Sequence, residues 1–198
     1  MSKVAGNQLF ARTDQGVWAS TDEGSNWNKV TSGTVTGIKA IGLSNDGVPT
    51  MYFGGTNGKF YRQDNAIYTG ISSHNLTSTL PMILRGDHIS WIRVHPKDRT
   101  TAYISFSDIE PRSRVYKGKN LTTGAPTWTA IGGDLPSELP VNCIEVDPEN
   151  PDDILFAGTD FGLYYTCNGG VNWTKVSILA NVDIRQLEFR ERDRHLFV

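Results

Sequence analysis

Acidic side chains in short β-strand-like segments are the first candidates for chemistry in this sequence. Hydrolysis of a glycosidic bond uses two carboxyl groups about 5–10 Å apart, one on each side of the bond. Three acidic residues in or beside such segments are therefore candidate catalytic groups: Glu145, Asp147 and Glu188. No surrounding motif distinguishes any of them. Glu145 and Glu188 alternate with apolar neighbours in the same pattern as Arg93, which favours ion pairs between neighbouring strands, or solvated positions, over catalysis.

Metal and cofactor chemistry has no support in the residue spacing. The four histidines, at positions 74, 88, 95 and 195, are scattered along the chain, and no pair has the separation that zinc sites use. No acidic loop has the ligand spacing of a calcium site, and no glycine-rich loop leads into a helix that would hold a phosphate. We therefore predict no metal and no cofactor.

Aromatic and basic residues on the same predicted strands are candidates for a binding surface. Trp91, Tyr103 and Tyr116 offer flat rings on which a sugar could stack, and Arg93 adds a cation. Large aromatic side chains are also frequent in protein cores. These four residues are therefore candidate ligand contacts, with core packing as the alternative for the rings.

Size and charge exclude several classes of function. The chain has 198 residues and a net charge of −2, from 19 basic and 21 acidic side chains, with no basic cluster. Nucleic-acid binding is therefore not expected. No apolar run is long enough to span a bilayer.

The two cysteines, Cys143 and Cys167, are predicted to lie roughly 10 Å apart across the strands, which is too far for a disulfide bond.

Two turns with the same residue pattern connect the strands that carry these candidates. Residues 20–27 read Ser-Thr-Asp-Glu-Gly-Ser-Asn-Trp, and residues 166–173 read Thr-Cys-Asn-Gly-Gly-Val-Asn-Trp. A hydroxyl and an Asp or Asn side chain can bond free backbone amides, glycine takes a backbone angle that side chains avoid, and tryptophan covers the turn. The predicted structural residues are Ser20, Asp22, Gly24 and Trp27 in the first turn, and Thr166, Asn168, Gly170 and Trp173 in the second.

The two turns and their flanking residues resemble the Asp-box, or BNR, repeat of β-propellers. Residues 13–22 align without a gap with residues 159–168. The resemblance implies a β-propeller in which each box is a structural hairpin away from any active site. The family includes sialidases, sortilin-type receptors, xyloglucan-degrading enzymes and many exported proteins without a known activity. It therefore implies an extracellular or periplasmic location, although residues 1–7 lack the apolar core of a signal peptide.

The repeat period favours a propeller. Trp27 and Trp173 are 146 positions apart, which corresponds to three repeats of about 49 residues, close to the 40–50 of four-stranded blades. Alternate apolar residues mark the innermost strand of successive modules, at positions 41/43, 92/94, 144/146 and 187/189. The predicted fold is all-β: a β-propeller, or a fragment of one, of about four four-stranded blades with Asp-box hairpins.

The predicted modules form one propeller domain. They cover residues 1–37, 38–88, 89–141, 142–183 and, in part, 184–198. Residues 9–30 are expected to supply only outer strands, residues 71–88 a connection without strands, and residues 184–189 the strand that opens the last module. We expect a piece of a longer propeller whose open blade edges drive self-association. A closed ring of four blades is the alternative.

The sequence favours a non-catalytic, exported Asp-box repeat domain that binds a protein or a glycan through its loops. Sialidase activity is disfavoured, because the arginine motif that sialidases carry near the start of their propeller is absent. The alternative function is that of a glycoside hydrolase of the xyloglucanase type, to which this chain would contribute part of the propeller. Whether the chain is an enzyme is therefore left open, and hydrolysis of a glycosidic bond is the activity to test.

Overall fold

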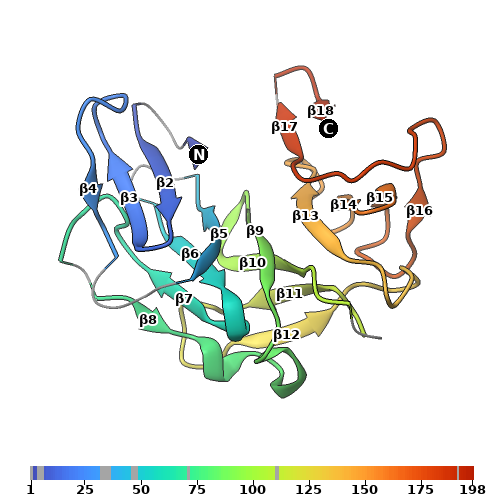
Figure 1. Ribbon diagram of the computed structural model, residues 1–198, viewed down its shortest axis with the longest axis horizontal. Coiled ribbons are helices and arrows are strands. Elements are labelled where there is room, and N and C mark those ends of the chain that lie inside the picture. Colours follow the sequence, from blue (N-terminus) through green and yellow to red (C-terminus); the bar gives the residue numbers. More distant parts are fainter. Residues whose placement is uncertain are drawn as a thin grey trace.

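The computed structural model describes residues 2–3, 7–31, 37–45, 49–70, 72–109, 112–190 and 192–198. These residues form four antiparallel four-stranded sheets and a two-stranded hairpin, with three short 3₁₀ helices between strands (Figure 1). The chain is therefore all-β, as the sequence predicts. None of the described helices is long and apolar enough to cross a membrane.

Each four-stranded sheet is a meander of strands that are consecutive in the chain. The first sheet consists of β1 (Ser2–Lys3), β2 (Leu9–Thr13), β3 (Gly16–Ser20) and β4 (Asn28–Lys29). The second consists of β5 (Ile38–Leu43), β6 (Met51–Gly55), β7 (Phe60–Gln63) and β8 (His74–Asn75). The third consists of β9 (Ile89–His95), β10 (Asp98–Phe106), β11 (Val115–Lys119) and β12 (Thr127–Ala130). The fourth consists of β13 (Val141–Val146), β14 (Leu155–Thr159), β15 (Gly162–Thr166) and β16 (Thr174–Lys175), and the hairpin of β17 (Glu188–Arg190) and β18 (His195–Phe197).

The repeated sequence at residues 13–22 and 159–168 folds into the same hairpin twice. Strands β2 and β3 pair from Leu9–Ser20 to Thr13–Gly16, and β14 and β15 pair from Leu155–Thr166 to Thr159–Gly162. In both hairpins the threonine hydroxyl accepts a backbone N–H two residues later, at 3.2 Å. A glycine with a positive φ follows, 143° at Gly16 and 109° at Gly162, because other residues rarely adopt that angle.

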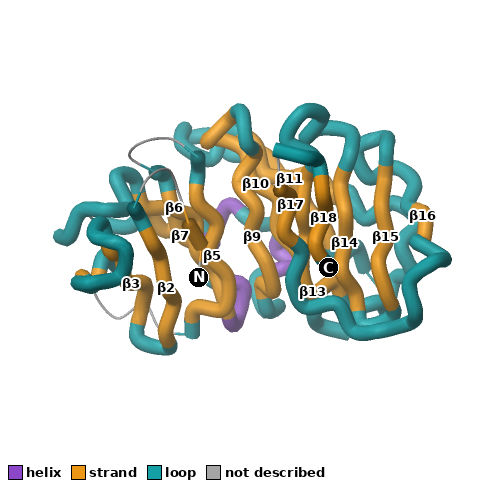
Figure 2. The backbone as a smooth tube through the Cα atoms, turned by 90° about the horizontal axis from the view of Figure 1, so that it is seen from above, coloured by secondary structure: helices purple, strands orange, loops and turns teal. Residues whose placement is uncertain are grey.

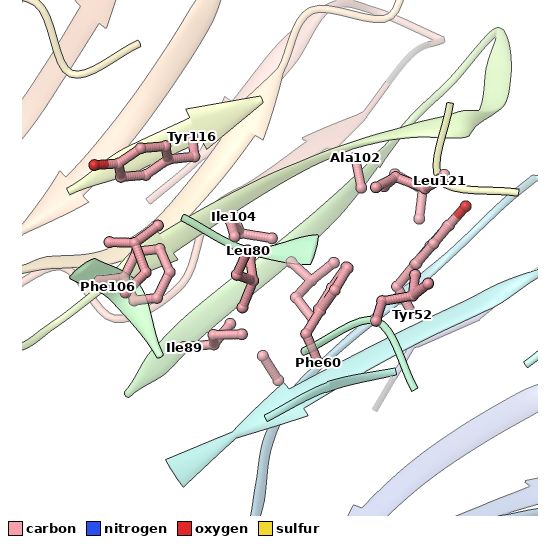
Figure 3. Close-up of a cluster of buried hydrophobic side chains, with 14 residues drawn as sticks. Tyr52, Phe60, Leu80, Ile89, Ala102, Ile104, Phe106, Tyr116 and Leu121 are labelled. Atoms are coloured by element: carbon pink, nitrogen blue, oxygen red, sulfur yellow. The ribbon is translucent and has the colours of Figure 1, made fainter. Parts of the chain in front are cut away.

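Apolar side chains between neighbouring sheets form the core. Figure 3 shows the cluster between the second and third sheets, where Tyr52 and Phe60 face Ile104 of β10. The rings of Tyr52 and Phe60 stack with centroids 5.8 Å apart, and Phe60 meets Trp128 edge-on at 5.4 Å. Burial of each such side chain contributes about 1.5–3 kcal/mol. The sheets are therefore joined face to face by apolar contacts, as propeller blades are.

The innermost strands of neighbouring sheets lie side by side along the inside of an arc (Figures 1 and 2). Gly42 of β5 backs onto β9 so closely that a Cβ there would lie 2.8 Å from the Ile92 carbonyl oxygen. The Ser90 hydroxyl donates to the Val141 carbonyl at 2.6 Å and so joins β9 to β13. Among the described strands, β1 pairs with β2 alone and β17 with β18 alone. The sheets therefore form an open arc, without the pairing that a closed four-bladed ring requires.

Three strand predictions are corrected by the structure. The first sheet does have an innermost strand, β1, whose two residues are too short to give a pattern in the sequence. Residues 72–88 are not free of strands, because β8 lies among them, followed by 3₁₀ helices at Thr77–Thr79 and Met82–Leu84. Residues 184–187 form no strand, since β17 begins at Glu188; Ile184 and Leu187 instead pack against Cys143. Both cysteines are free, as predicted.

Candidate functional site

A hollow lies along the innermost strands, on the inside of the arc. It has a volume of about 1290 Å³ and is lined by residues of β5, β9, β13 and the β17–β18 hairpin. Apolar side chains, such as Ile41, Leu43 and Trp91, share this lining with charged ones. The described residues contain no cluster of histidine, cysteine, aspartate and glutamate that could hold a metal ion. The hollow is a candidate binding site.

The one buried carboxylate of the hollow, among the residues described, is already neutralised. Glu145 is 1% exposed, and its Oε1 lies 2.7 Å from Nε of Arg93 on the neighbouring inner strand. The same oxygen accepts the Val146 N–H at 2.9 Å. The guanidinium offsets the charge of this buried carboxylate, and the backbone amide satisfies one of its acceptor positions. Glu145 therefore serves to join β9 to β13.

Basic residues outnumber acidic ones in the lining of the hollow, but three of them are held in ion pairs. Its lining contains the basic residues Arg12, Lys39, Arg93, Arg185 and Arg190, and the acidic residues Glu145 and Glu188. Arg185 pairs with Asp183 at 2.5 Å and Arg190 with Asp193 at 2.6 Å. Lys39 on β5 and Glu188 on β17 are both exposed. The two lining carboxylates thus differ in environment, one sealed in an ion pair and the other solvated.

Asp147, the third catalytic candidate, lies at the end of β13 and outside the lining of the hollow. It is 2% exposed. Its Oδ1 accepts the backbone N–H groups of Glu149 and Asn150 at 2.8 and 3.2 Å, and its Oδ2 accepts Nη2 of Arg194 at 2.5 Å. Burial raises the pKa of Asp147, but these donors outweigh it and hold the pKa below its usual value. Asp147 therefore caps a turn and attaches the β17–β18 hairpin to the fourth sheet.

The four candidate ligand contacts divide into two pairs. Trp91 and Arg93 line the hollow. Tyr103 is fully buried and donates from its hydroxyl to the Pro151 carbonyl at 2.7 Å, and Tyr116 packs edge-on against Phe106. Burial raises the pKa of both tyrosines. Trp91 and Arg93 thus face space that a ligand could enter, whereas the tyrosine rings pack between sheets.

The two repeated turns have the same hydrogen-bond geometry. Ser20 Oγ donates to Asp22 at 2.8 Å and accepts the Gly24 N–H at 2.8 Å, while Asp22 accepts the Asn26 N–H at 2.9 Å. In the second turn the corresponding distances, made by Thr166 and Asn168, are 2.9, 3.1 and 2.9 Å. In both turns, a hydroxyl and a carboxylate or amide side chain therefore accept hydrogen bonds from backbone N–H groups of the same turn.

The tryptophans of the two turns have different partners. Trp27 Nε1 donates to the Gly24 carbonyl within its own turn at 3.0 Å. Trp173 Nε1 donates to the Ile131 carbonyl of the third sheet at 3.0 Å, and the Trp173 N–H is accepted by Asp134 at 2.6 Å. The second turn thus also joins two sheets. Asp134 was not predicted, because nothing in its local sequence signals a partner 39 positions away.

The two turns supply a matched test of the role of Asp22. We expect Asp22→Asn to melt close to the wild-type temperature, because Asn168 makes the same contacts in the second turn. Asp22→Ala should melt at a lower temperature, because the amides that Asp22 holds lose their acceptor. Thermal melts of both variants at neutral pH check this order, and equal melting of the two would contradict it.

The pH dependence of the same variants gives a second readout. The Asn26 N–H, followed by the Asn26 and Ser20 side chains, holds the pKa of Asp22 below its usual value. The stability that this gives is complete above the unfolded-state pKa and is lost as pH falls through the folded-state pKa. Asp22→Asn should therefore lose less stability than the wild type in melts recorded below pH 4, where its neutral side chain does not titrate.

Comparisons with known proteins identify the fold. No known protein family and no curated protein matches the sequence. Among solved structures, the GH74 enzyme of Niastella koreensis superposes with a TM-score of 0.69 at 15% identity, over 96% of this chain and 30% of that one. The GH74 xyloglucanase of Xanthomonas campestris gives 0.66 at 14%, over 96% and 31%. YCF48 of Cyanidioschyzon merolae gives 0.62 at 14%, over 93% and 58%.

These likenesses establish the architecture and nothing narrower. All identities are below one fifth, and the neighbours include both enzymes and the β-propeller domain of Cps50 (Swd1) from Myceliophthora thermophila, at a TM-score of 0.67. The chain spans less than two thirds of the length of each of these structures. It thus has the fold of a β-propeller, present in the described residues as an open arc of four sheets and a hairpin.

Proposed function

We propose that this chain is a non-catalytic Asp-box repeat domain that binds an extended segment of a partner protein in the hollow along its innermost strands. Membership of the Asp-box group is supported by the two turns, in which the hydroxyl and the Asp or Asn of each motif make the same three hydrogen bonds. The same resemblance underlies the proposal that the domain acts outside the cytoplasm.

The state of Glu145 is the observation that carries the non-catalytic assignment. Glycoside hydrolysis needs two carboxyl groups that can reach one bond, one of them able to give up a proton. Glu145 is buried and bound to Arg93 at 2.7 Å, Asp147 is bound to Arg194, and Glu188 remains as the solvated carboxylate of the hollow. A pair of free carboxyl groups is therefore not available among the lining residues described.

A peptide segment is favoured over a glycan by the composition of the lining. Two of the three rings predicted to stack on a sugar, Tyr103 and Tyr116, are withdrawn into the core. Trp91 is the third, and it shares the lining with Phe189 and Phe197. The exposed amide side chain of Gln186, which can bond a peptide backbone, lies among the lining residues. One structural neighbour, YCF48, has been determined bound to a D1 peptide, with a TM-score of 0.64 and 9% identity.

Selection from a random peptide library on the immobilised protein tests this function. We expect enriched peptides whose binding falls at least about tenfold in Lys39→Glu, which reverses an exposed charge of the hollow. Lys119→Glu reverses an exposed charge outside the hollow and is the matched control. Equal loss in both variants would contradict binding in the hollow. Turnover of a xyloglucan oligosaccharide, abolished by Glu145→Gln, would contradict the non-catalytic assignment.

A further inference from the structure

The outermost strands of the four sheets differ in how well their free edges are protected. Edge strands present unpaired N–H and C=O groups, and proteins protect them with short strands, lysine or proline. Within the described residues, β4, β8 and β16 are two residues long, and each carries a basic or titratable side chain: Lys29, His74 or Lys175. Strand β12 is four residues long, and residues 121–133 around it contain no charged side chain.

The free edge of β12 has a defined set of donors and acceptors. The Ile131 N–H bonds the Val115 carbonyl, and β12 pairs with β11 in register from Tyr116–Ala130 to Lys119–Thr127. In an antiparallel ladder the bonded pairs alternate, so Thr127 and Thr129 bond to β11. The backbone N–H and C=O groups of Trp128 and Ala130 therefore point away from the sheet. Thr127, Thr129 and Ala130 are exposed, and no backbone–backbone hydrogen bond outside the sheet uses the outward-pointing groups of Trp128 or Ala130 among the described residues.

We propose that the β12 edge is a self-association site, at which a second copy of this chain adds its own β12 in an antiparallel pairing. The edge is self-complementary, because a two-fold axis through Thr129 brings Trp128 of each copy opposite Ala130 of the other. All four outward-pointing groups of each strand then find partners. Axes nearer the start of the strand are disfavoured, because Pro126 has no N–H to donate. The result is one continuous eight-stranded sheet across two copies.

Charge favours a second copy as the occupant. Like charges directly opposite each other across strands destabilise a pairing, and β12 with its flanks has none to oppose. The other three outer strands would bring Lys29, Lys175 or His74 close to its own copy. The hollow lies along the innermost strands, at the opposite side of each sheet. Dimerisation at β12 therefore leaves the proposed peptide site open.

Cross-linking through an introduced cysteine tests both the dimer and its register. Residue 129 would face its own copy in a non-hydrogen-bonded pair, with Cα atoms roughly 4.5 Å apart, which is within disulfide range. The exposed native Cys167 is first replaced by threonine, because the first turn has a threonine, Thr21, at the matching position. Cys143 is kept, because it is buried. The Thr129→Cys variant is then oxidised mildly. Thr174→Cys, at an exposed position on β16, is oxidised in parallel as the control. We expect covalent dimers of the 21.9 kDa chain to form at least about tenfold faster in Thr129→Cys.

Sedimentation equilibrium provides the test without a covalent bond. An edge pairing of this size buries little surface, so the dimer should be weak, with the average mass rising as protein approaches about 1 mM. Thr129→Lys places two positive charges opposite each other and should return the mass to that of one chain. A constant monomer mass in the wild type, or equal cross-linking at residues 129 and 174, would overturn the proposal. Equal cross-linking would assign the association to other surfaces.

Discussion

Replacing Arg93 with alanine is expected to destabilise the protein by about 3 kcal/mol, because it leaves the buried carboxylate of Glu145 without its guanidinium. Glu145 is 1% exposed, whereas the Arg93 side chain is 31% exposed. Removal of the arginine therefore opens a path for water but does not bring the carboxylate to the surface. Urea unfolding measures the change as a lower midpoint at an unchanged slope.

The companion variants distinguish an ion pair that joins strands from a catalytic group. Glu145→Gln keeps the shape of the side chain and removes its charge, so it should cost less than Arg93→Ala. The double variant Arg93→Ala/Glu145→Gln no longer has the Glu145 charge that Arg93→Ala leaves without its partner. It should therefore regain much of the stability that Arg93→Ala loses. Costs that simply add, with no recovery in the double variant, would show that the pairing at 2.7 Å contributes nothing.

Gly170→Ala is expected to be more damaging than Gly24→Ala, although the two glycines hold the same position in the two turns. Both have positive φ angles, 88° at Gly170 and 92° at Gly24, which cost a residue with a Cβ about 1–2 kcal/mol. At Gly24 a new Cβ would have its nearest neighbour at 3.5 Å, on the Leu9 side chain. At Gly170 it would overlap the carbonyl oxygen of Ile131, which directly follows β12 of the neighbouring third sheet.

The added cost of this overlap should bring Gly170→Ala to about 3–5 kcal/mol, while Gly24→Ala stays near the cost of its backbone angle alone. Urea unfolding of the two variants side by side gives the comparison, and each serves as the control for the other. Equal losses would mean that the second turn can move away from Ile131 without penalty. In that case the Trp173–Ile131 hydrogen bond would not hold the two sheets together.

Repetition made the fold predictable from the sequence. Strands such as β6 and β14 are continuous apolar runs bounded by turn residues, and the same hairpin and turn recur at residues 13–27 and 159–173. The elements that were missed have no such signal. Strands β1 and β8 each have two residues, which is less than one period of alternation, and their pairing is decided by the neighbouring strand.

The site was less predictable, because a propeller buries both faces of its sheets. Alternation places Tyr103 and Arg93 on strands, but it does not tell which face meets another sheet and which meets solvent. Tyr103 proved to be fully buried, and Arg93 lines the hollow. Lys39 and Arg12 were not identified as lining residues, because they come from different strands whose approach depends on how the sheets are stacked.

The order of the strands has a consequence for how the chain folds. Every four-stranded sheet is built from strands that follow one another in the chain, so most pairings close short loops and have a low entropic cost. Mixed or all-β domains fold slowly when distant segments must meet, but here each sheet can form before its neighbours. The main contacts between sheets in the described part of the chain join neighbouring sheets, as in other repeat proteins, so unfolding can proceed sheet by sheet from either end of the arc.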